Sequence, residues 1–143
     1  ARSYESTLNQ LLDSGIVPCL VDGEMLHGMT RMENGDYSIL GAKAKAVVIP
    51  EGCYPPEEYL PAFPCRNFSS SADLPYQLFE QGYLRFWKTN PQVCMGIMED
   101  NLNDFLTMVN LTEQNQVCQV YSPKTKMEIA LSPYQVLIEK IQK

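Results

Sequence analysis

The N-terminal part of the chain combines one helical pattern of apolar positions with several short strand-like patterns. Apolar side chains recur at helical spacing from Tyr4 to Leu12, and Gly15 follows as a stop, which predicts an amphipathic helix near residues 4–13. Short apolar segments between turn residues predict strands at residues 16–21, 25–32, 36–40 and 45–49. The pair Asn34-Gly35 tolerates positive φ at both positions, so it predicts a hairpin with a type I′ turn.

Residues 50–75 differ from the rest because prolines interrupt the apolar segments. Six of the ten prolines lie here, and proline cannot donate a backbone hydrogen bond to a sheet. The segment also carries aromatic side chains that a solvated linker would lack, so we expect an irregular excursion that packs on the sheet. A helix near residues 73–82 should follow, ended by Gly82 in the left-handed conformation.

The second half of the chain predicts strands again, joined by short connections. They cover residues 83–88, 93–98, 104–111, 117–121 and 126–131. Connections of this length favour an antiparallel meander. Asn101 and Asn103 could each cap a helical turn running to Met108, but we favour a strand for this segment.

The C-terminal segment has the clearest helical pattern. Ser132, Pro133 and Gln135 fit the cap, the first helical position and the partner residue of a capping box. The apolar residues that share one helical stripe are Tyr134, Leu137, Ile138 and Ile141. This pattern predicts an amphipathic helix over residues 133–142 that binds the sheet or a second copy of the chain.

These elements together define the expected fold class. We expect a mainly β domain of the α+β class, in which an antiparallel sheet or small barrel of roughly seven to nine strands carries an N-terminal, a mid-chain and a C-terminal helix. With 143 residues, 45% of them hydrophobic, the chain can build one ordinary core. We therefore assign residues 1–143 to a single globular domain.

The charge pattern argues against nucleic-acid and membrane partners. Seventeen acidic and eleven basic residues give a net charge of −6, and no window holds the basic cluster that a phosphate backbone requires. No apolar run approaches the roughly 20 residues that cross a bilayer, and the N-terminus lacks a signal-peptide pattern. An acidic surface would suit a basic peptide better.

The cysteines predict reduced thiols. There are five, an odd number, and they are widely spaced without a CxxC pair, unlike the dense even set of a small secreted scaffold. The sequons at Asn67 and Asn110 point to the secretory route instead, but about one such match is expected by chance in this composition. We therefore expect a cytoplasmic or nuclear protein.

The sequence lacks the patterns of common catalytic and cofactor sites. His27 is the single histidine, so zinc sites that need two are impossible, and no phosphate-binding or nucleophile-elbow glycine motif occurs. Residues 99–104 concentrate oxygen ligands, but their spacing fails the EF-hand pattern and fits a polar turn better. Cys65 has Arg66 beside it but lacks a base. We therefore predict a non-catalytic protein without a metal or cofactor.

The remaining distinctive feature is an aromatic and acidic middle. Nine of the fourteen aromatic residues lie between residues 54 and 87, and aromatic side chains are enriched at recognition surfaces. The residues that we assign to a partner-binding surface are Tyr54, Glu57, Glu58, Tyr59, Phe63, Phe68 and Trp87. Acids beside aromatic rings suit a cationic peptide. The simpler explanation, that these rings anchor the excursion to its own core, stays open.

Elimination leaves a protein-interaction module as the expected function. It would bind a partner segment, for instance a basic one, through the aromatic and acidic surface, or pair with another copy of the chain as a homodimer. Two alternatives stay open: an OB-like domain that binds single-stranded nucleic acid, and a hydrolase-type enzyme with an unrecognised site.

Overall fold

The structure is a computed structural model in which the chain divides into two compact units. It describes residues 2–22, 24–25, 28–39, 41–50, 53, 67–69 and 73–143. The first unit comprises Ala1–Thr7 and Pro18–Leu74, and the second comprises Leu8–Val17 and Pro75–Lys143. The assignment of the whole chain to a single domain stays a prediction.

The first unit contains two small sheets. Strands β1 (Thr30–Arg31), β2 (Tyr37–Ile39) and β3 (Ala42–Ala44) form an antiparallel sheet in this order, whereas β4 (Val47–Ile49) pairs in parallel with β5 (Asn67–Ser69). Alternation along β2 buries Tyr37 and Ile39, as expected of a strand with one face on a core. The strand predicted at residues 36–40 is therefore confirmed.

The hairpin between β1 and β2 forms at Asn34-Gly35 as predicted, but with a different turn. Gly35 has a φ of 87°, whereas Tyr134 is the one non-glycine residue in the described ranges with a positive φ, so Asn34 is not left-handed. The Gly35 N–H donates to the Met32 carbonyl at 2.9 Å. This pattern is a type I turn followed by a left-handed glycine. The Asn34 side chain stabilises it by accepting a hydrogen bond from the Asp36 N–H at 3.0 Å.

Several other predictions for the N-terminal half need correction. Residues 16–21 form no strand, because Pro18 cannot donate to a ladder and the apolar side chains beside it are largely exposed. The strand predicted at residues 25–32 is confined to β1, and the one at residues 45–49 is shortened to β4. Strand β3 was not predicted, because alanine and lysine have low strand propensity. The excursion at residues 50–75 lies largely outside the described residues.

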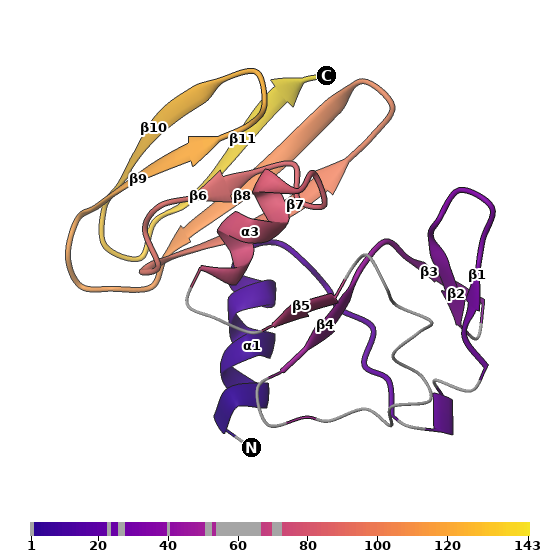
Figure 1. Ribbon diagram of the computed structural model, residues 1–143. Helices are drawn as coiled ribbons and strands as arrows, with labels where there is room; N and C mark the ends of the chain where they lie inside the picture. The colour runs from indigo at the N-terminus through magenta and orange to yellow at the C-terminus, as the bar shows by residue number, and fades with distance from the viewer. Residues whose placement is uncertain are drawn as a thin grey trace. The chain divides into compact units, whose positions relative to one another are not determined.

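The second unit arranges six strands in two layers (Figure 1). One sheet has the order β11-β8-β7 and contains β7 (Val93–Glu99), β8 (Asn103–Asn110) and β11 (Val136–Gln142). The other has the order β10-β9-β6 and contains β6 (Trp87–Lys88), β9 (Gln116–Tyr121) and β10 (Lys126–Leu131). All pairings are antiparallel. The chain changes sheet after β6, β8 and β10, so these strands form neither a simple meander nor a closed barrel.

Most strands predicted for this half are confirmed. The predictions at residues 93–98, 117–121 and 126–131 match β7, β9 and β10. The segment ending at Met108 is part of β8, so the strand was the correct choice over a helical turn. Of the strand predicted at residues 83–88, only β6 forms.

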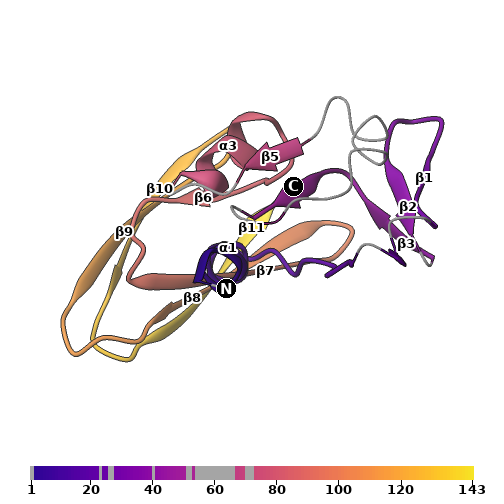
Figure 2. The ribbon, with the colours of Figure 1, turned by 60° about the horizontal axis from the view of Figure 1, so that its bottom comes forward.

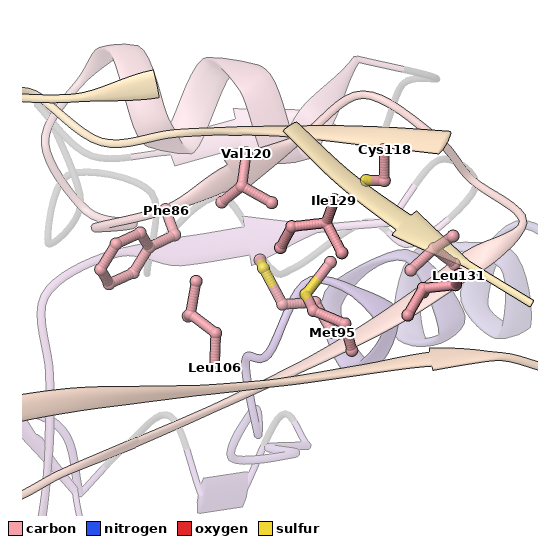
Figure 3. Close-up of a cluster of buried hydrophobic side chains, with 9 residues drawn as sticks. Phe86, Met95, Leu106, Cys118, Val120, Ile129 and Leu131 are labelled. Atoms are coloured by element: carbon pink, nitrogen blue, oxygen red, sulfur yellow. The ribbon is translucent and has the colours of Figure 1, made fainter. Parts of the chain in front are cut away.

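The core of the second unit lies between its two sheets. The buried side chains are Phe86, Val93, Met95, Leu106, Met108, Cys118, Val120, Ile129 and Leu131. Figure 3 shows Val120 of one sheet and Leu106 of the other pointing into the space between the two sheets. Strand β8 alternates half-buried and buried residues along its whole length, because one of its faces lies on this core. Removing these side chains from water is the main stabilising contribution in this unit.

Both described helices end at a glycine, as the sequence predicts. Helix α1 covers Arg2–Asp13 and α3 covers Leu74–Glu80. Gly15 and Gly82 follow them, each with a φ of 84°. In both cases the glycine and the residue after it donate to carbonyls in the last turn of the helix. This Schellman motif needs a left-handed residue, and glycine adopts that conformation without a Cβ clash.

The end of α1 lies against strand β7 (Figure 2). Ser14 forms an isolated parallel bridge with Met95. A Cβ added at Gly15 would lie 2.8 Å from Cγ1 of Ile97, which is closer than real Cβ atoms approach. Gly15 therefore serves both as the helix stop and as the point of close approach between helix and sheet.

The C-terminal segment is a strand, and the helix predicted over residues 133–142 is wrong. Strand β11 pairs with β8 along the length of both. Tyr134 has a φ of 59°, which a helix interior does not allow, and the Gln135 N–H closes a turn by donating to the Ser132 carbonyl at 3.1 Å. The Gln135 side chain still accepts from the Ser132 N–H at 2.8 Å, so one half of the capping box forms inside this turn. The β-branched residues that follow suit a strand, and pairing with β8 decides the conformation.

Candidate functional site

Most of the predicted partner-binding surface lies outside the described residues. This holds for Tyr54, Glu57, Glu58, Tyr59 and Phe63, and also for His27 and Cys65. Phe68 belongs to β5, where its backbone pairs with Val48. Trp87 begins β6 in the second unit, and it is the predicted site residue whose side chain the structure describes.

Trp87 belongs to a group of three aromatic rings, Tyr76, Trp87 and Tyr121, which we call the Trp87 cluster. The Trp87 ring meets Tyr76 of α3 edge to face, with ring centroids 5.0 Å apart. Tyr121 of β9 lies directly opposite Trp87 in the β6–β9 ladder, with ring centroids 5.5 Å apart. Opposed residues of an antiparallel pair share one face of the sheet. Val120, the neighbour of Tyr121, is buried in the core, so the face with the rings is turned outward.

The Trp87 cluster is partly open to solvent. Tyr76 is 41% exposed, and Trp87 and Tyr121 are half-buried. The Tyr121 hydroxyl donates to Oε1 of Gln119 at 2.9 Å, which fixes one end of the ring. Nζ of Lys126 lies 5.4 Å from the centroid of the Tyr121 ring, a distance at which the negative face of the ring attracts a cation. The cluster can therefore contact both apolar and cationic groups.

Sequence reasoning identified Trp87 but missed Tyr121. The two residues are far apart in sequence, and only the pairing of β6 with β9 brings them together. The available signal was the alternation in residues 117–121, which separates the buried Cys118 and Val120 from the outward positions. That alternation shows which face Tyr121 occupies but not which strand lies beside it.

The other face of β6 carries a small polar group. Lys88 is half-buried and donates from Nζ to the Asn90 carbonyl at 3.2 Å, and burial lowers the pKa of Lys88.

Sγ of Cys94 donates to Oδ1 of Asp13 at 3.6 Å. Burial, followed by the charge of Asp13, raises the pKa of the Cys94 thiol. A raised pKa suppresses the nucleophilic thiolate, so Cys94 has the properties of a structural cysteine.

The acidic residues at one end of β7 and β8 bind basic residues of the same chain. Arg85 forms ion pairs with Glu99 at 3.1 Å and with Asp104 at 2.7 Å. Lys143 pairs with Glu99 at 2.6 Å. The hydrogen bond from Lys143, and then the charge of Arg85, lower the pKa of Glu99. These carboxylates are therefore engaged in holding the sheet end together.

Asp100 stabilises the turn between β7 and β8. Its Oδ1 accepts from the N–H groups of Leu102 and Asn103 at 2.8 and 2.7 Å, and these bonds lower the pKa of Asp100. The prediction of a polar turn at residues 99–104 is confirmed. Within the described ranges, no three His, Cys, Asp or Glu side chains are grouped to hold a metal ion.

The sequon residue Asn110 is fully buried at the end of β8. Its Nδ2 donates to the carbonyls of Gln114 and Ser132 at 2.7 and 3.0 Å. Its Oδ1 accepts from both the N–H and the hydroxyl of Thr112, at 2.9 and 2.7 Å. A glycan would have to attach to the Nδ2 that makes these bonds. The folded second unit therefore offers no glycosylation site at Asn110, which instead connects two turns.

Comparisons with known proteins give no family for this chain. No helix of the described part is long and apolar enough to cross a membrane. No family model matches the chain, and no curated protein is significantly similar to it.

Proposed function

We propose that the chain is a non-catalytic protein-interaction module that binds a segment of a partner protein through the Trp87 cluster. The observation that carries this proposal is the outward position of three partly exposed rings, supplied by α3, β6 and β9. Aromatic side chains bury a large area with little loss of conformational freedom, which is why interfaces are enriched in them. Because the rings support one another, a partner would meet a preformed surface.

A segment that contains lysine or arginine is the partner chemistry that suits this surface. Lys126 already lies over the Tyr121 ring, which supports cation binding by the cluster. Glu128 lies on the same face of the sheet, opposite Gln119 in the β9–β10 ladder, and the chain has a net charge of −6. An acidic surface attracts a cationic segment over a Debye length of about 8 Å at physiological salt. A partner arginine would stack on the exposed ring of Tyr76.

Peptide selection against the whole chain tests this proposal. Tyr76→Ala and Trp87→Ala should each weaken the selected peptides roughly tenfold or more, because aromatic anchors dominate interface energies. Tyr134→Ala is the matched control, since Tyr134 is 61% exposed and lies in the turn before β11, away from the cluster. Urea unfolding would show that the variants remain folded. Equal affinity of the selected peptides for wild type, Tyr76→Ala and Trp87→Ala would refute the assignment.

We also propose that the protein works in the cytoplasm or nucleus. Four described cysteines are free thiols: Cys19, Cys53, Cys94 and Cys118. Reduced cysteines, two of them exposed, are typical of a reducing compartment. The sequon at Asn110 gives little support for secretion, because the Asn110 side chain is buried and hydrogen-bonded in the folded protein.

Charge, strand arrangement and thiol chemistry weigh against the two alternative functions. The OB-like reading depended on a barrel, whereas the described strands form separate sheets, and the net charge of −6 repels nucleic acid. A cysteine hydrolase using Cys94 would need an activated thiolate, whereas burial raises the pKa of the Cys94 thiol.

A further inference from the structure

Within the described residues, no strand pairs with the edge of β11 that faces away from β8. Two hydrogen bonds show which residues of β11 bond to β8. The Asn110 N–H donates to the Gln135 carbonyl at 3.0 Å, and the Lys143 N–H donates to the Leu102 carbonyl at 2.9 Å. Residues that bond to β8 alternate with residues that do not. The backbone N–H and C=O groups of the odd-numbered residues therefore point toward β8. Those of the even-numbered residues point away from it: Val136, Ile138, Lys140 and Gln142. Among residues 73–143, no other strand pairs with this edge.

The first two side chains along this open edge, Val136 and Ile138, are apolar, and the next two, Lys140 and Gln142, are polar; all four are exposed. Val136 and Ile138 are 59% and 63% exposed, and both lie on the outward face of the sheet, opposite Val109 and Thr107 of β8. Strand β11 contains no proline, and its regular register with β8 shows no bulge. Proteins block sheet edges with proline, bulges or charged side chains, and of these devices β11 carries only Lys140 at an open position. The part of the edge at Val136 and Ile138 is therefore a site for pairing with another strand.

We propose that β11 pairs antiparallel with β11 of a second copy, with the two-fold axis at Ile138. This pairing joins the β11-β8-β7 sheets of two copies into one continuous sheet. The inference goes beyond the proposed function, because it uses a different sheet from the one that carries the Trp87 cluster.

Charge and hydrogen-bond parity select this register. An axis at Glu139 or Lys140 would place like charges directly opposite each other, which is unfavourable in a cross-strand pair. An axis at Leu137 shortens the ladder, because the left-handed Tyr134 ends the strand conformation. With the axis at Ile138, the open groups of Val136 meet those of Lys140 of the other copy. About six backbone hydrogen bonds then form, two for each of the three opposed pairs.

The size of this contact predicts a weak dimer. One pair of edge strands buries less than the roughly 1,200 to 2,000 Å² of a stable protein interface. We therefore expect a dissociation constant of roughly 10 to 100 µM. Sedimentation equilibrium of the whole chain between about 5 and 500 µM covers this range.

Two opposite charges at position 136 test the register. In the proposed dimer, residue 136 lies beside Lys140 of the other copy at two symmetric places. Val136→Glu should therefore tighten dimerisation roughly three- to tenfold at low salt, and Val136→Lys should weaken it by a similar factor, with both effects reduced at high salt. Val117→Glu and Val117→Lys are the matched controls, because Val117 is 54% exposed but lies on the central strand β9. These controls should leave the dissociation constant unchanged.

A proline tests the backbone pairing itself. The Ile138 N–H points away from β8, so Ile138→Pro leaves the β8–β11 ladder intact but removes the central hydrogen bonds of the dimer. We expect a folded monomer with a cooperative urea transition. A failure of this variant to fold leaves the pair of charged variants as the decisive measurement.

The outcomes separate this inference from the proposed function. A wild-type chain that stays monomeric at about 500 µM, or Glu and Lys variants that shift the constant in the same direction, would overturn the pairing at β11. Peptide binding that depends on Trp87 would in that case still stand, because Trp87 belongs to the other sheet. Opposite shifts of the two variants would support the dimer even if the Trp87→Ala variant bound peptides normally.

Discussion

Replacing Asn110 with alanine should destabilise the second unit by about 2–4 kcal/mol. The Asn110 side chain makes four short hydrogen bonds that join the turn after β8 to the turn before β11. A net contribution of about 0.5–1.5 kcal/mol per bond gives about 2–6 kcal/mol. In the alanine variant the single hydroxyl hydrogen of Thr112, released from Asn110, can donate to the Gln114 carbonyl at 3.1 Å, and the Ser132 carbonyl also accepts from the Gln135 N–H. Because these two carbonyls keep a donor, the loss should fall in the lower part of that range.

Asn110→Asp should be worse than Asn110→Ala at neutral pH. The substitution turns a donor into an acceptor that faces the carbonyls of Gln114 and Ser132. It also buries a charge, which raises the pKa of the new carboxyl in the folded state above its unfolded value of about 3.9. The folded protein then binds more protons than the unfolded one, so the stability of this variant falls as pH rises above about 4. Its deficit relative to wild type should therefore be larger at pH 7 than at pH 4.

The assay can follow the second unit selectively. Trp87 is the single tryptophan and lies in this unit, so its fluorescence during urea unfolding reports the stability of the part that contains Asn110. The urea midpoint should fall with little change in the slope. Asn115→Ala in the same loop is the matched control, because Asn115 is exposed, and it should change stability by less than about 0.5 kcal/mol. The reasoning is refuted if Asn110→Ala and Asn115→Ala have the same effect, or if Asn110→Asp is the more stable variant at pH 7.

Three further results should follow from the same structure. Gly15→Ala should destabilise the second unit more than Gly82→Ala, because both have a φ of 84° but only the Cβ at position 15 would meet a neighbour, at 2.8 Å; equal losses in urea midpoint would contradict this. The pKa of Asp100 is lowered in the folded state, so the stability that Asp100 contributes is fully present above its unfolded pKa of about 3.9 and is lost as pH falls through the folded pKa. Asp100→Asn should therefore reduce the fall in the free energy of unfolding at acid pH. At pH 7, iodoacetamide should modify the exposed Cys19 before Cys94, whose pKa is raised, as followed by mass spectrometry; the reverse order would refute the assigned environment.

The parts of the fold that could be predicted are those with local causes. Gly15 and Gly82 end helices because a left-handed residue closes the last turn, and that requirement is visible in a few residues of sequence. The strands at residues 93–98, 117–121 and 126–131 follow from alternation. The division into two sheets could not be predicted, because it depends on which strands pair after each turn. Short connections favour hairpins in general, but the turns after β8 and β10 instead carry the chain to the other sheet.

The candidate site shows the same division between local and long-range causes. Trp87 could be predicted from the concentration of aromatic residues in the middle of the chain. Its neighbour Tyr121 could not, because β6 has only two residues and carries almost no pairing information. The acidic part of the prediction rests on Glu57 and Glu58, which lie outside the described residues. Within the described part, the acid on the same face as the cluster is Glu128, which sequence reasoning had not selected.

The residue pattern that predicted a C-terminal helix also accounts for the exposed apolar side chains of β11. In a helix, Leu137, Ile138 and Ile141 would share one stripe that a single surface could cover. In a strand, successive side chains point to opposite faces, so Leu137 and Ile141 turn toward the core while Val136 and Ile138 remain outside. The core therefore uses only half of the apolar residues in this segment. The half that the core does not bury makes only cross-strand contacts, such as Val136 with Val109, and pairing at β11 would place Ile138 beside Ile138 of the second copy.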